Sequence, residues 1–191
     1  MKKILSVAVL GSTGYVGLEL VKILIRHPNL QIKFLGCENS PSKDIREFDQ
    51  NIVIDTLPKL DLNNNFDPKN YDLVFLSLPH GVSHKFVKNF NRKIKIIDLS
   101  ADFRLDSEKL YSKNYNNDHA CPELLNQFIY GLPEINKDVL NTNFDVAVPG
   151  CYPTSVLIPL IPLLEKNLIK TDNIIIDSKS GYSGAGKKFD L

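Results

Sequence analysis

The chain has 191 residues, 43% of them hydrophobic, and a formal net charge of +1 at pH 7. This composition is typical of a globular protein with one sizeable core and the start of a second part. The balanced charge, with no long basic run, argues against nucleic acid or an acidic membrane surface as the main partner.

Cysteine usage and the N-terminus both favour the cytoplasm. Cys37, Cys121 and Cys151 are an odd number without C-x-x-C spacing, so we predict neither a disulfide framework nor a cysteine-rich zinc site, and we assign no metal ligands. Two lysines precede a short apolar stretch, but cleavage there would destroy the glycine motif that follows. We therefore interpret residues 4–10 as a strand and not as part of a signal peptide. No stretch approaches the ~18 uninterrupted apolar residues that span a membrane.

The first 37 residues predict a strand, a glycine-rich turn, a helix and a second strand. The strand over residues 4–10 is followed by "GSTGYVGLELVKILIRHP", in which apolar residues recur at helical spacing up to Pro28. The second strand covers Leu30 to Cys37. Such a unit begins a doubly wound parallel sheet, so we predict a fold of the α/β class.

Further strands are predicted from apolar runs. "YDLVFLSLP" (residues 71–79) and "KIKIIDLSA" (residues 93–101) are typical of parallel strands buried on both faces. A helix is expected between them over Gly81–Asn91. A strand over Asp145–Val148 is expected to close the sheet.

The segments between these elements show no domain linker. Residues 39–44 and 61–70 are polar and are predicted to be surface loops. Residues 105–143 are polar and tyrosine-rich, without a clear pattern apart from the turn-like "YGLPE". We place a first domain over residues 1–148 and the start of a second domain over residues 149–191.

The last segment predicts a turn at Pro149-Gly150, a helix, a strand in "NIIIDSKS" and a glycine-rich loop. Pro159 and Pro162 fall inside this helix, where a proline costs ~3 kcal/mol, so we expect a kink or a late helix start. About forty residues follow Cys151, too few for an independent core. We therefore expect that the chain is truncated and that a C-terminal part is missing.

Gly11, Gly14 and Gly17 form a G-x-x-G-x-x-G motif between the first strand and the first helix. Glycines in this place let the backbone turn tightly and let a pyrophosphate lie against the helix N-terminus. A tight turn without a ligand is the alternative, but the position inside a strand–helix–strand unit favours a dinucleotide. Ser12 and Thr13 add hydroxyls that can reach a phosphate.

The residues after the second strand bear on which dinucleotide binds. Glu38 could hold a ribose 2′-hydroxyl, which is typical of NAD sites. Ser40, Ser42 and Lys43 could instead hold a 2′-phosphate, as in NADP sites. The residues themselves leave both possibilities open.

"LSLPHG" and "DLSADFR" end two buried strands at the carboxyl edge of the predicted sheet, where open α/β folds bind ligands. The first motif contains His80, and the second contains Ser100, Asp102 and Arg104. These residues could contact ligands. Alternatively, His80 caps a turn and the other three form a structural hydrogen-bond cluster.

Cys151 follows the Pro149-Gly150 turn at the start of the last predicted helix. An isolated cysteine in an apolar segment is usually a small buried hydrophobe. At a helix N-terminus, however, unpaired N–H groups and the helix dipole favour a thiolate, so this position suits a nucleophile. The later loop "SGYSGAGKK" has a composition suited either to folding over an anion or to a flexible surface loop.

The chain resembles the N-acetyl-gamma-glutamyl-phosphate reductase family in six motifs: "GSTGYVGLEL", "SLPHGVS", "DLSADFRL", "YGLPE", "AVPGCYPTS" and "DSKSGYSGAGK". The resemblance covers the whole chain. "PGCYPTS" and "SGYSGAG" separate it from the aspartate-semialdehyde dehydrogenases that share the architecture. The resemblance implies a Rossmann domain, an α+β substrate domain like that of glyceraldehyde-3-phosphate dehydrogenase, NADP(H), and a homo-oligomer (tetramer or dimer) at full length.

The resemblance also implies a reaction of arginine biosynthesis. Cys151 would attack the acyl phosphate to form a thioester, which NADPH would reduce to N-acetyl-L-glutamate 5-semialdehyde. The alternatives are an acyl-phosphate reductase like aspartate-semialdehyde dehydrogenase and a non-catalytic nicotinamide-binding module. In the family a histidine general acid/base lies downstream of the "SGAG" loop. No histidine follows Cys151 in these 191 residues, and we assign that role to none of the four histidines.

The motifs and the resemblance together predict a site in which Cys151 is the nucleophile. Cofactor contacts are expected from Gly11, Ser12, Thr13, Gly14, Tyr15, Val16, Gly17, Ser40, Ser42, Lys43, Pro79, His80, Ser180 and Gly181. Substrate contacts are expected from Ser100, Asp102, Arg104, Ser183, Gly184 and Ala185.

Overall fold

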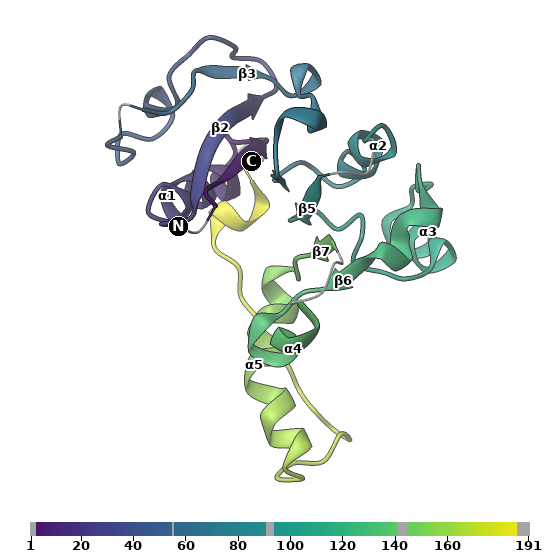
Figure 1. Ribbon diagram of the computed structural model, residues 1–191. Coiled ribbons are helices and arrows are strands. Elements are labelled where there is room, and N and C mark those ends of the chain that lie inside the picture. The colour runs from purple at the N-terminus through teal and green to yellow at the C-terminus, as the bar shows by residue number, and fades with distance from the viewer. Residues whose placement is uncertain (1–2, 55, 91–93, 141–144, 187–191) are drawn as a thin grey trace.

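The computed structural model describes residues 3–54, 56–90, 94–140 and 145–186. These residues contain a parallel sheet of seven strands in the order β3-β2-β1-β4-β5-β7-β6 (Figure 1). The strands are β1 (Leu5–Leu10), β2 (Leu30–Cys37), β3 (Leu60–Leu62), β4 (Leu73–Leu76), β5 (Lys95–Asp98), β6 (Phe128–Tyr130) and β7 (Asp145–Ala147). The helices are α1 (Tyr15–Leu24), α2 (Ser83–Lys88), α3 (Glu108–Tyr115), α4 (Pro133–Leu140) and α5 (Cys151–Glu165).

The strand order is that of a doubly wound sheet. From β1 the chain moves outward through β2 to β3, and it then returns to place β4 on the other side of β1. The direction of winding therefore changes between β1 and β4, whose carboxyl ends lie side by side. Ligands of open α/β sheets bind at such a point. The predicted doubly wound α/β sheet is confirmed.

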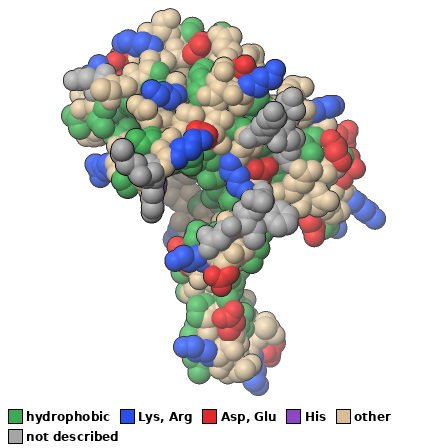
Figure 2. All heavy atoms as spheres, in the orientation of Figure 1, with side chains coloured by type: hydrophobic (Ala, Val, Ile, Leu, Met, Phe, Trp, Pro, Cys, Tyr) green, Lys and Arg blue, Asp and Glu red, His purple; other side chains and the backbone are tan. Residues whose placement is uncertain are grey.

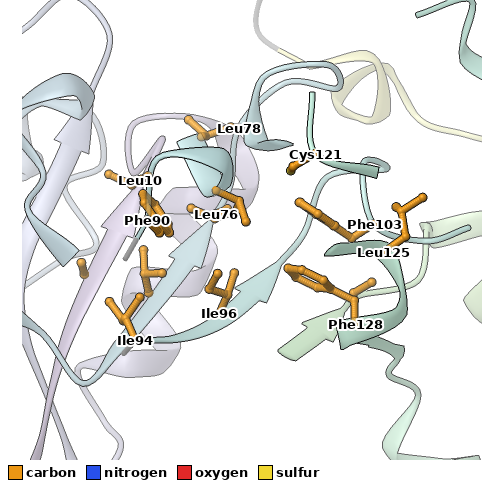
Figure 3. Packing of buried hydrophobic residues seen from close by; sticks show 14 of the residues in the cluster. Leu10, Leu76, Leu78, Phe90, Ile94, Ile96, Phe103, Cys121, Leu125 and Phe128 are labelled. Carbon is orange, nitrogen blue, oxygen red and sulfur yellow. The ribbon is translucent and has the colours of Figure 1, made fainter. Parts of the chain in front are cut away.

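Both faces of the sheet are covered by apolar side chains. In β1, Val9 belongs to the cluster that contains Val21 of α1, whereas Leu10 belongs to the cluster on the other face, which contains Val87 of α2. Figure 3 shows the second cluster, in which the rings of Phe103 and Phe128 stack with centroids 3.8 Å apart. Burial on both faces explains why the strands have nearly continuous apolar sequences.

Two short strands were not predicted, and one of them changes the edge of the sheet. β3 begins just before the predicted loop of residues 61–70 and runs into it, and β6 lies in the stretch without a clear pattern. Because β6 pairs with β7 at the end of the sheet, the expectation that the strand at residues 145–148 closes it is wrong. A three-residue strand is too short for an alternating pattern, so only its pairing with a neighbour defines it.

The last helix does not start late, which was one of the two effects expected of its prolines. α5 begins at Cys151, without a late start, and continues to Glu165 with Pro159 and Pro162 inside it. Each of these prolines deprives the carbonyl four residues earlier of its helical donor. No residue of α5 is buried, so water can satisfy those carbonyls.

The segment after α5 also departs from prediction. No strand forms in residues 173–180, and Ile175 is 93% exposed, because the described residues offer no neighbouring strand there. Figure 2 shows apolar side chains at the surface of the narrow lower part of the molecule, to which α5 contributes. Within the described ranges, no helix combines the length and the apolar content needed to cross a membrane.

Candidate active site

The glycine motif forms a tight turn packed against the residues that directly follow β4. Gly11 has a φ of +74°, and a Cβ atom there would lie 2.2 Å from the backbone oxygen of Ser77. A Cβ atom at Gly17 would lie 2.3 Å from the backbone oxygen of Gly11. Distances this short require glycine at both positions, since backbone atoms cannot move aside cheaply. The motif is therefore a close-packed turn and not only a flexible loop.

The end of this turn suits an anion. Gly14 is the N-cap of α1 and supplies no side-chain cap, and α1 has no acidic residue in its first turn. The N–H groups of a first helical turn lack intrahelical acceptors and attract anions. Tyr15 and Val16 are exposed here, whereas Thr13 is half-buried. The residues present thus fit the pyrophosphate of a dinucleotide.

Ser12 does not have the environment expected of a phosphate ligand. Its side chain is fully buried, and its Oγ donates a 2.9 Å hydrogen bond to the backbone oxygen of Gly36 in β2. The Ser12 hydroxyl therefore ties the turn to the neighbouring strand. The prediction that this hydroxyl reaches a phosphate is corrected, because the donor is already engaged inside the protein.

The loop after β2 lies against β3. The N–H of Ser42 donates to the backbone oxygen of Leu60 at 2.6 Å, and the Leu60 N–H donates to the backbone oxygen of Lys43 at 2.9 Å. The side chains of Ser42 and Lys43 are exposed, as is that of Glu38, while Ser40 is half-buried. The geometry leaves both cofactor assignments open, because side chains of both kinds are accessible.

His80 lies at the carboxyl edge of the sheet. It is exposed, together with Pro79, and its Nδ1 accepts a 2.9 Å hydrogen bond from the N–H of Ala101. The ring of Tyr115, at the end of α3, lies near it with centroids 6.2 Å apart. His80 thus stabilises the loop after β5, and its second ring nitrogen is not used by this hydrogen bond.

Ser100 and Asp102 form a buried hydrogen-bond cluster. The Asp102 carboxylate is fully buried and accepts hydrogen bonds from the N–H of Gly81 (2.7 Å), the N–H of His84 (3.1 Å) and the hydroxyl of Tyr111 (3.0 Å). Ser100 Oγ donates to Asp98 at 2.7 Å. Of the two interpretations of these residues, the structural one holds, and direct substrate contact by Ser100 or Asp102 is corrected because neither side chain reaches solvent.

The same cluster perturbs the titration of its members. Burial raises the pKa of Asp98 to about 6, an effect that the hydrogen bonds from Ser100 only partly oppose. Burial also raises the pKa of Tyr111, and the nearby Asp102 carboxylate adds to this effect. The two buried carboxylates, Asp98 and Asp102, lie at the ends of one short loop. Hydrogen bonds hold this loop and offset the cost of burying the two carboxylates away from water.

Arg104 connects this loop to the turn before Cys151. Its Nε donates to the backbone oxygen of Val148 at 2.8 Å, and its Nη2 donates to that of Leu99 at 3.0 Å. A Cβ atom at Gly150 would lie 3.1 Å from Arg104 Nη1. The guanidinium therefore lies against the turn that presents Cys151.

Cys151 is exposed at the first position of α5, after the N-cap Gly150. It lines a cavity of about 580 Å³, together with Arg104, Leu105, Tyr115, Tyr130, Gly150, Tyr152 and Pro153. The interpretation as a buried hydrophobe is wrong for Cys151 but describes Cys37 and Cys121, which are buried. Leu105, the three tyrosines and Pro153 were not predicted as site residues, although all but Tyr115 lie in the quoted motifs.

The glycine-rich loop lies apart from this cavity. Ser180, Gly181, Ser183 and Gly184 are exposed, and none of them is among the residues that line it. The turn η5 (Tyr182–Ala185) forms here, but the side chain of Ala185 lies outside the described part of the chain, as do Lys187 and Lys188. The cofactor and substrate contacts assigned to this loop stay predictions.

Two family profiles match the chain. One is described as "Semialdehyde dehydrogenase, NAD binding domain" and matches residues 6–143. The other is described as "Semialdehyde dehydrogenase, dimerisation domain" and matches residues 151–191.

Curated relatives match most of the chain. It is 46% identical over 186 residues to the N-acetyl-gamma-glutamyl-phosphate reductase of Ehrlichia canis (strain Jake), with 95% of this chain and 53% of that protein covered. It is 42% identical over 191 residues to the protein of the same name from Acinetobacter baylyi, with 98% of this chain and 54% of that protein covered. The chain thus spans about half the length of the curated relatives it matches.

Solved structures share the fold at low identity. Aspartate semialdehyde dehydrogenase II from Vibrio cholerae, complexed with ASA, aligns with a TM-score of 0.67 and 20% identity over 98% of this chain and 49% of that chain. Aspartate semialdehyde dehydrogenase with NADP from Candida albicans aligns with a TM-score of 0.59 and 19% identity, over 86% of this chain and 48% of that chain. At these identities the likeness is one of fold, and it agrees with the predicted architecture.

Proposed function

The chain belongs to the semialdehyde dehydrogenase family, and from this membership we propose that the protein is an oxidoreductase of arginine biosynthesis. It reduces N-acetyl-gamma-glutamyl phosphate to N-acetyl-L-glutamate 5-semialdehyde and phosphate, with NADPH as the reductant and Cys151 as the nucleophile. Relatives that carry the name of this activity are 42% and 46% identical to the chain, which supports the choice of substrate.

The exposed thiol at the start of α5 carries the proposal. Cys151 lies in a cavity beside Arg104, where a small anionic substrate can enter. The thiolate attacks the acyl carbon, the bond from that carbon to the phosphate oxygen breaks, and a thioester on Cys151 and inorganic phosphate result. The Arg104 guanidinium attracts the phosphate, and N–H groups at the start of α5 stabilise the oxyanion.

The turn over residues 11–17 is proposed to hold the dinucleotide. Its close-packed glycines and the uncapped start of α1 support this assignment. When bound, NADPH supplies the hydride that reduces the thioester to the aldehyde. Tyr115 lies near His80 and also lines the cavity that contains Cys151. It is therefore placed between the proposed cofactor site and the thiol.

The proposal extends to assembly and compartment. We assign residues 1–148 to the nucleotide-binding domain and 149–191 to the start of the substrate domain. The match to a dimerisation domain and the absence of buried residues in α5 support a homo-oligomer, a tetramer or dimer, of the full-length protein. The three free cysteines suit the reducing cytoplasm.

An assay of the full-length protein tests the proposal, with NADPH and either N-acetyl-gamma-glutamyl phosphate or β-aspartyl phosphate. We expect turnover of the first substrate, no turnover by Cys151→Ala, and unchanged NADPH binding by that variant. Ser155→Ala, a change at an exposed position of the same helix, serves as the control.

Two outcomes would favour the alternatives. Preference for β-aspartyl phosphate would indicate an aspartate-semialdehyde dehydrogenase. Binding of NADPH without reduction of either substrate would indicate a non-catalytic module. Substantial turnover by Cys151→Ala would exclude the covalent route.

A further inference from the structure

We propose that Asn63 is a positioning residue of the dinucleotide site, which holds the glycine turn from the far side of β2. The inference rests on the proposed function, because it concerns the turn assigned to the pyrophosphate. It adds a residue that follows β3 and that no sequence motif connects with the glycines.

The contact crosses the sheet. Asn63 begins the turn η2 (Asn63–Asn65), directly after β3, and its Oδ1 accepts a 3.0 Å hydrogen bond from the N–H of Gly11. β2 lies between β3 and β1, so the side chain must pass over β2 to reach Gly11 (Figure 1). It passes at Gly36, where a Cβ atom would lie 2.3 Å from Asn63 Oδ1. Gly36 therefore makes room for the contact.

The contact directs the first two N–H groups of the turn into the protein. The Gly11 N–H donates to Asn63, and the Ser12 N–H donates to the backbone oxygen of Gly36 at 2.8 Å. Neither group is then turned toward a ligand. An anion must use donors later in the turn, at the uncapped start of α1. Asn63 thus fixes the orientation of the peptide group at Gly11, from which the turn leads to the start of α1.

The chemistry of the amide suggests why the residue is asparagine. The Gly11 N–H needs an acceptor, so the oxygen of the Asn63 amide faces Gly11 and the NH2 group faces away. An asparagine side chain is neutral, so it adds no charge beside the proposed pyrophosphate position. An aspartate would make the same hydrogen bond but would add a negative charge close to the bound anion. This difference separates a positioning role at an anion site from support of the fold alone.

The experiment compares Asn63→Asp and Asn63→Ala with wild type in the full-length protein. Asn64→Asp places the same charge on an exposed neighbouring residue and is the matched control. NADPH affinity is measured by fluorescence titration at about 0.02 M and about 0.5 M salt. The kcat, the KM for NADPH and the thermal unfolding midpoint are measured in parallel.

We expect Asn63→Asp to raise the Kd for NADPH about tenfold at low salt and by a clearly smaller factor at high salt, because the repulsion is screened. Its unfolding midpoint should stay close to that of wild type, since the acceptor for Gly11 is kept. Asn63→Ala should raise the KM for NADPH about fivefold with little change in kcat, because it loses the acceptor but adds no charge.

Several results would overturn the inference. One is an NADPH affinity of both Asn63 variants within about twofold of wild type. This change is smaller than the one expected when a single hydrogen bond is lost. Another is an equal effect of Asn64→Asp, which would show that the charge need not lie at Asn63. A salt-independent loss of affinity with a lower kcat and a lower unfolding midpoint would assign Asn63 to the fold alone. Wild-type protein that binds no NADPH would overturn the proposed function and this inference with it.

Discussion

Arg104 Nε donates a hydrogen bond of 2.8 Å to the backbone oxygen of Val148, which ties the loop after β5 to the turn before Cys151. Nη2 of the same guanidinium is engaged by the backbone oxygen of Leu99. Nη1 lies toward Gly150 and the cavity. One side chain therefore both holds the thiol-bearing turn and places positive charge beside it.

Replacement of Arg104 should separate these two effects. Arg104→Ala loses the charge and both hydrogen bonds, so we expect kcat/KM for the acyl phosphate to fall by about 10²–10³. Arg104→Lys keeps the charge but not the planar fork, and it should retain part of the activity. Steady-state kinetics of the full-length protein measures both effects, with Arg26→Lys at an exposed position as the control. Activity of Arg104→Ala close to wild type would contradict the assignment.

The glycine turn makes a prediction about stability without any ligand. The Cβ atom of Gly17→Ala would approach the Gly11 backbone oxygen to 2.3 Å, so we expect a loss of about 2–4 kcal/mol in the free energy of unfolding. Gly14→Ala is the comparison, because its Cβ atom would lie 3.5 Å from the same oxygen, an ordinary contact. Urea unfolding measures both variants. Equal losses would show that steric contact does not explain the motif.

Cofactor preference should depend on the loop after β2. We expect NADPH to bind more tightly than NADH, and we expect Lys43→Ala to weaken NADPH binding about three- to tenfold while leaving NADH unchanged. The exposed Lys43 side chain lies 3.9 Å from Glu47 Oε2, a loose contact that leaves it able to turn to a 2′-phosphate. Fluorescence titration with both cofactors measures this, and Lys33→Ala in β2 is the control. Equal affinity of wild type for the two cofactors would contradict the expected preference for NADPH and would mean that Glu38 offsets the contribution of this loop.

Asp98 should make stability depend on pH. Burial raises its pKa from 3.8 to about 6, so the folded protein binds this proton more tightly than the unfolded chain does. Stability from this group is therefore present below about pH 4, is lost as pH rises toward about 6, and is constant above that. Asp98→Asn cannot ionise. As pH rises from about 4 to about 6, its free energy of unfolding should therefore gain on the order of 1–3 kcal/mol relative to that of wild type.

Urea unfolding at several pH values between about 4 and about 8 measures this difference. Asp106→Asn, a change of an exposed carboxylate, is the matched control. A difference between Asp98→Asn and wild type that does not change with pH would show that Asp98 is not the titrating group.

The local pattern of the sequence was sufficient for the first half of the site. The strand, glycine turn, helix and second strand over residues 4–37 are each defined by residues close together in the chain, and the structure has them within one or two residues of the predicted ends, apart from the end of α1. Cys151 at a helix N-terminus follows in the same way from the Pro149-Gly150 turn. The motifs also identified the family, whose profiles match residues 6–143 and 151–191.

Packing between distant parts of the chain sets what these elements contact. β3 and β6 have three residues each, so their existence depends on pairing with β2 and β7 and not on any periodicity. Asp102 looks like a ligand residue in sequence, yet its carboxylate is used by backbone N–H groups 18 and 21 residues away. The contact of Asn63 with Gly11 spans 52 positions and depends on the missing side chain of Gly36. Such contacts are set by strand order, which a single sequence does not encode locally.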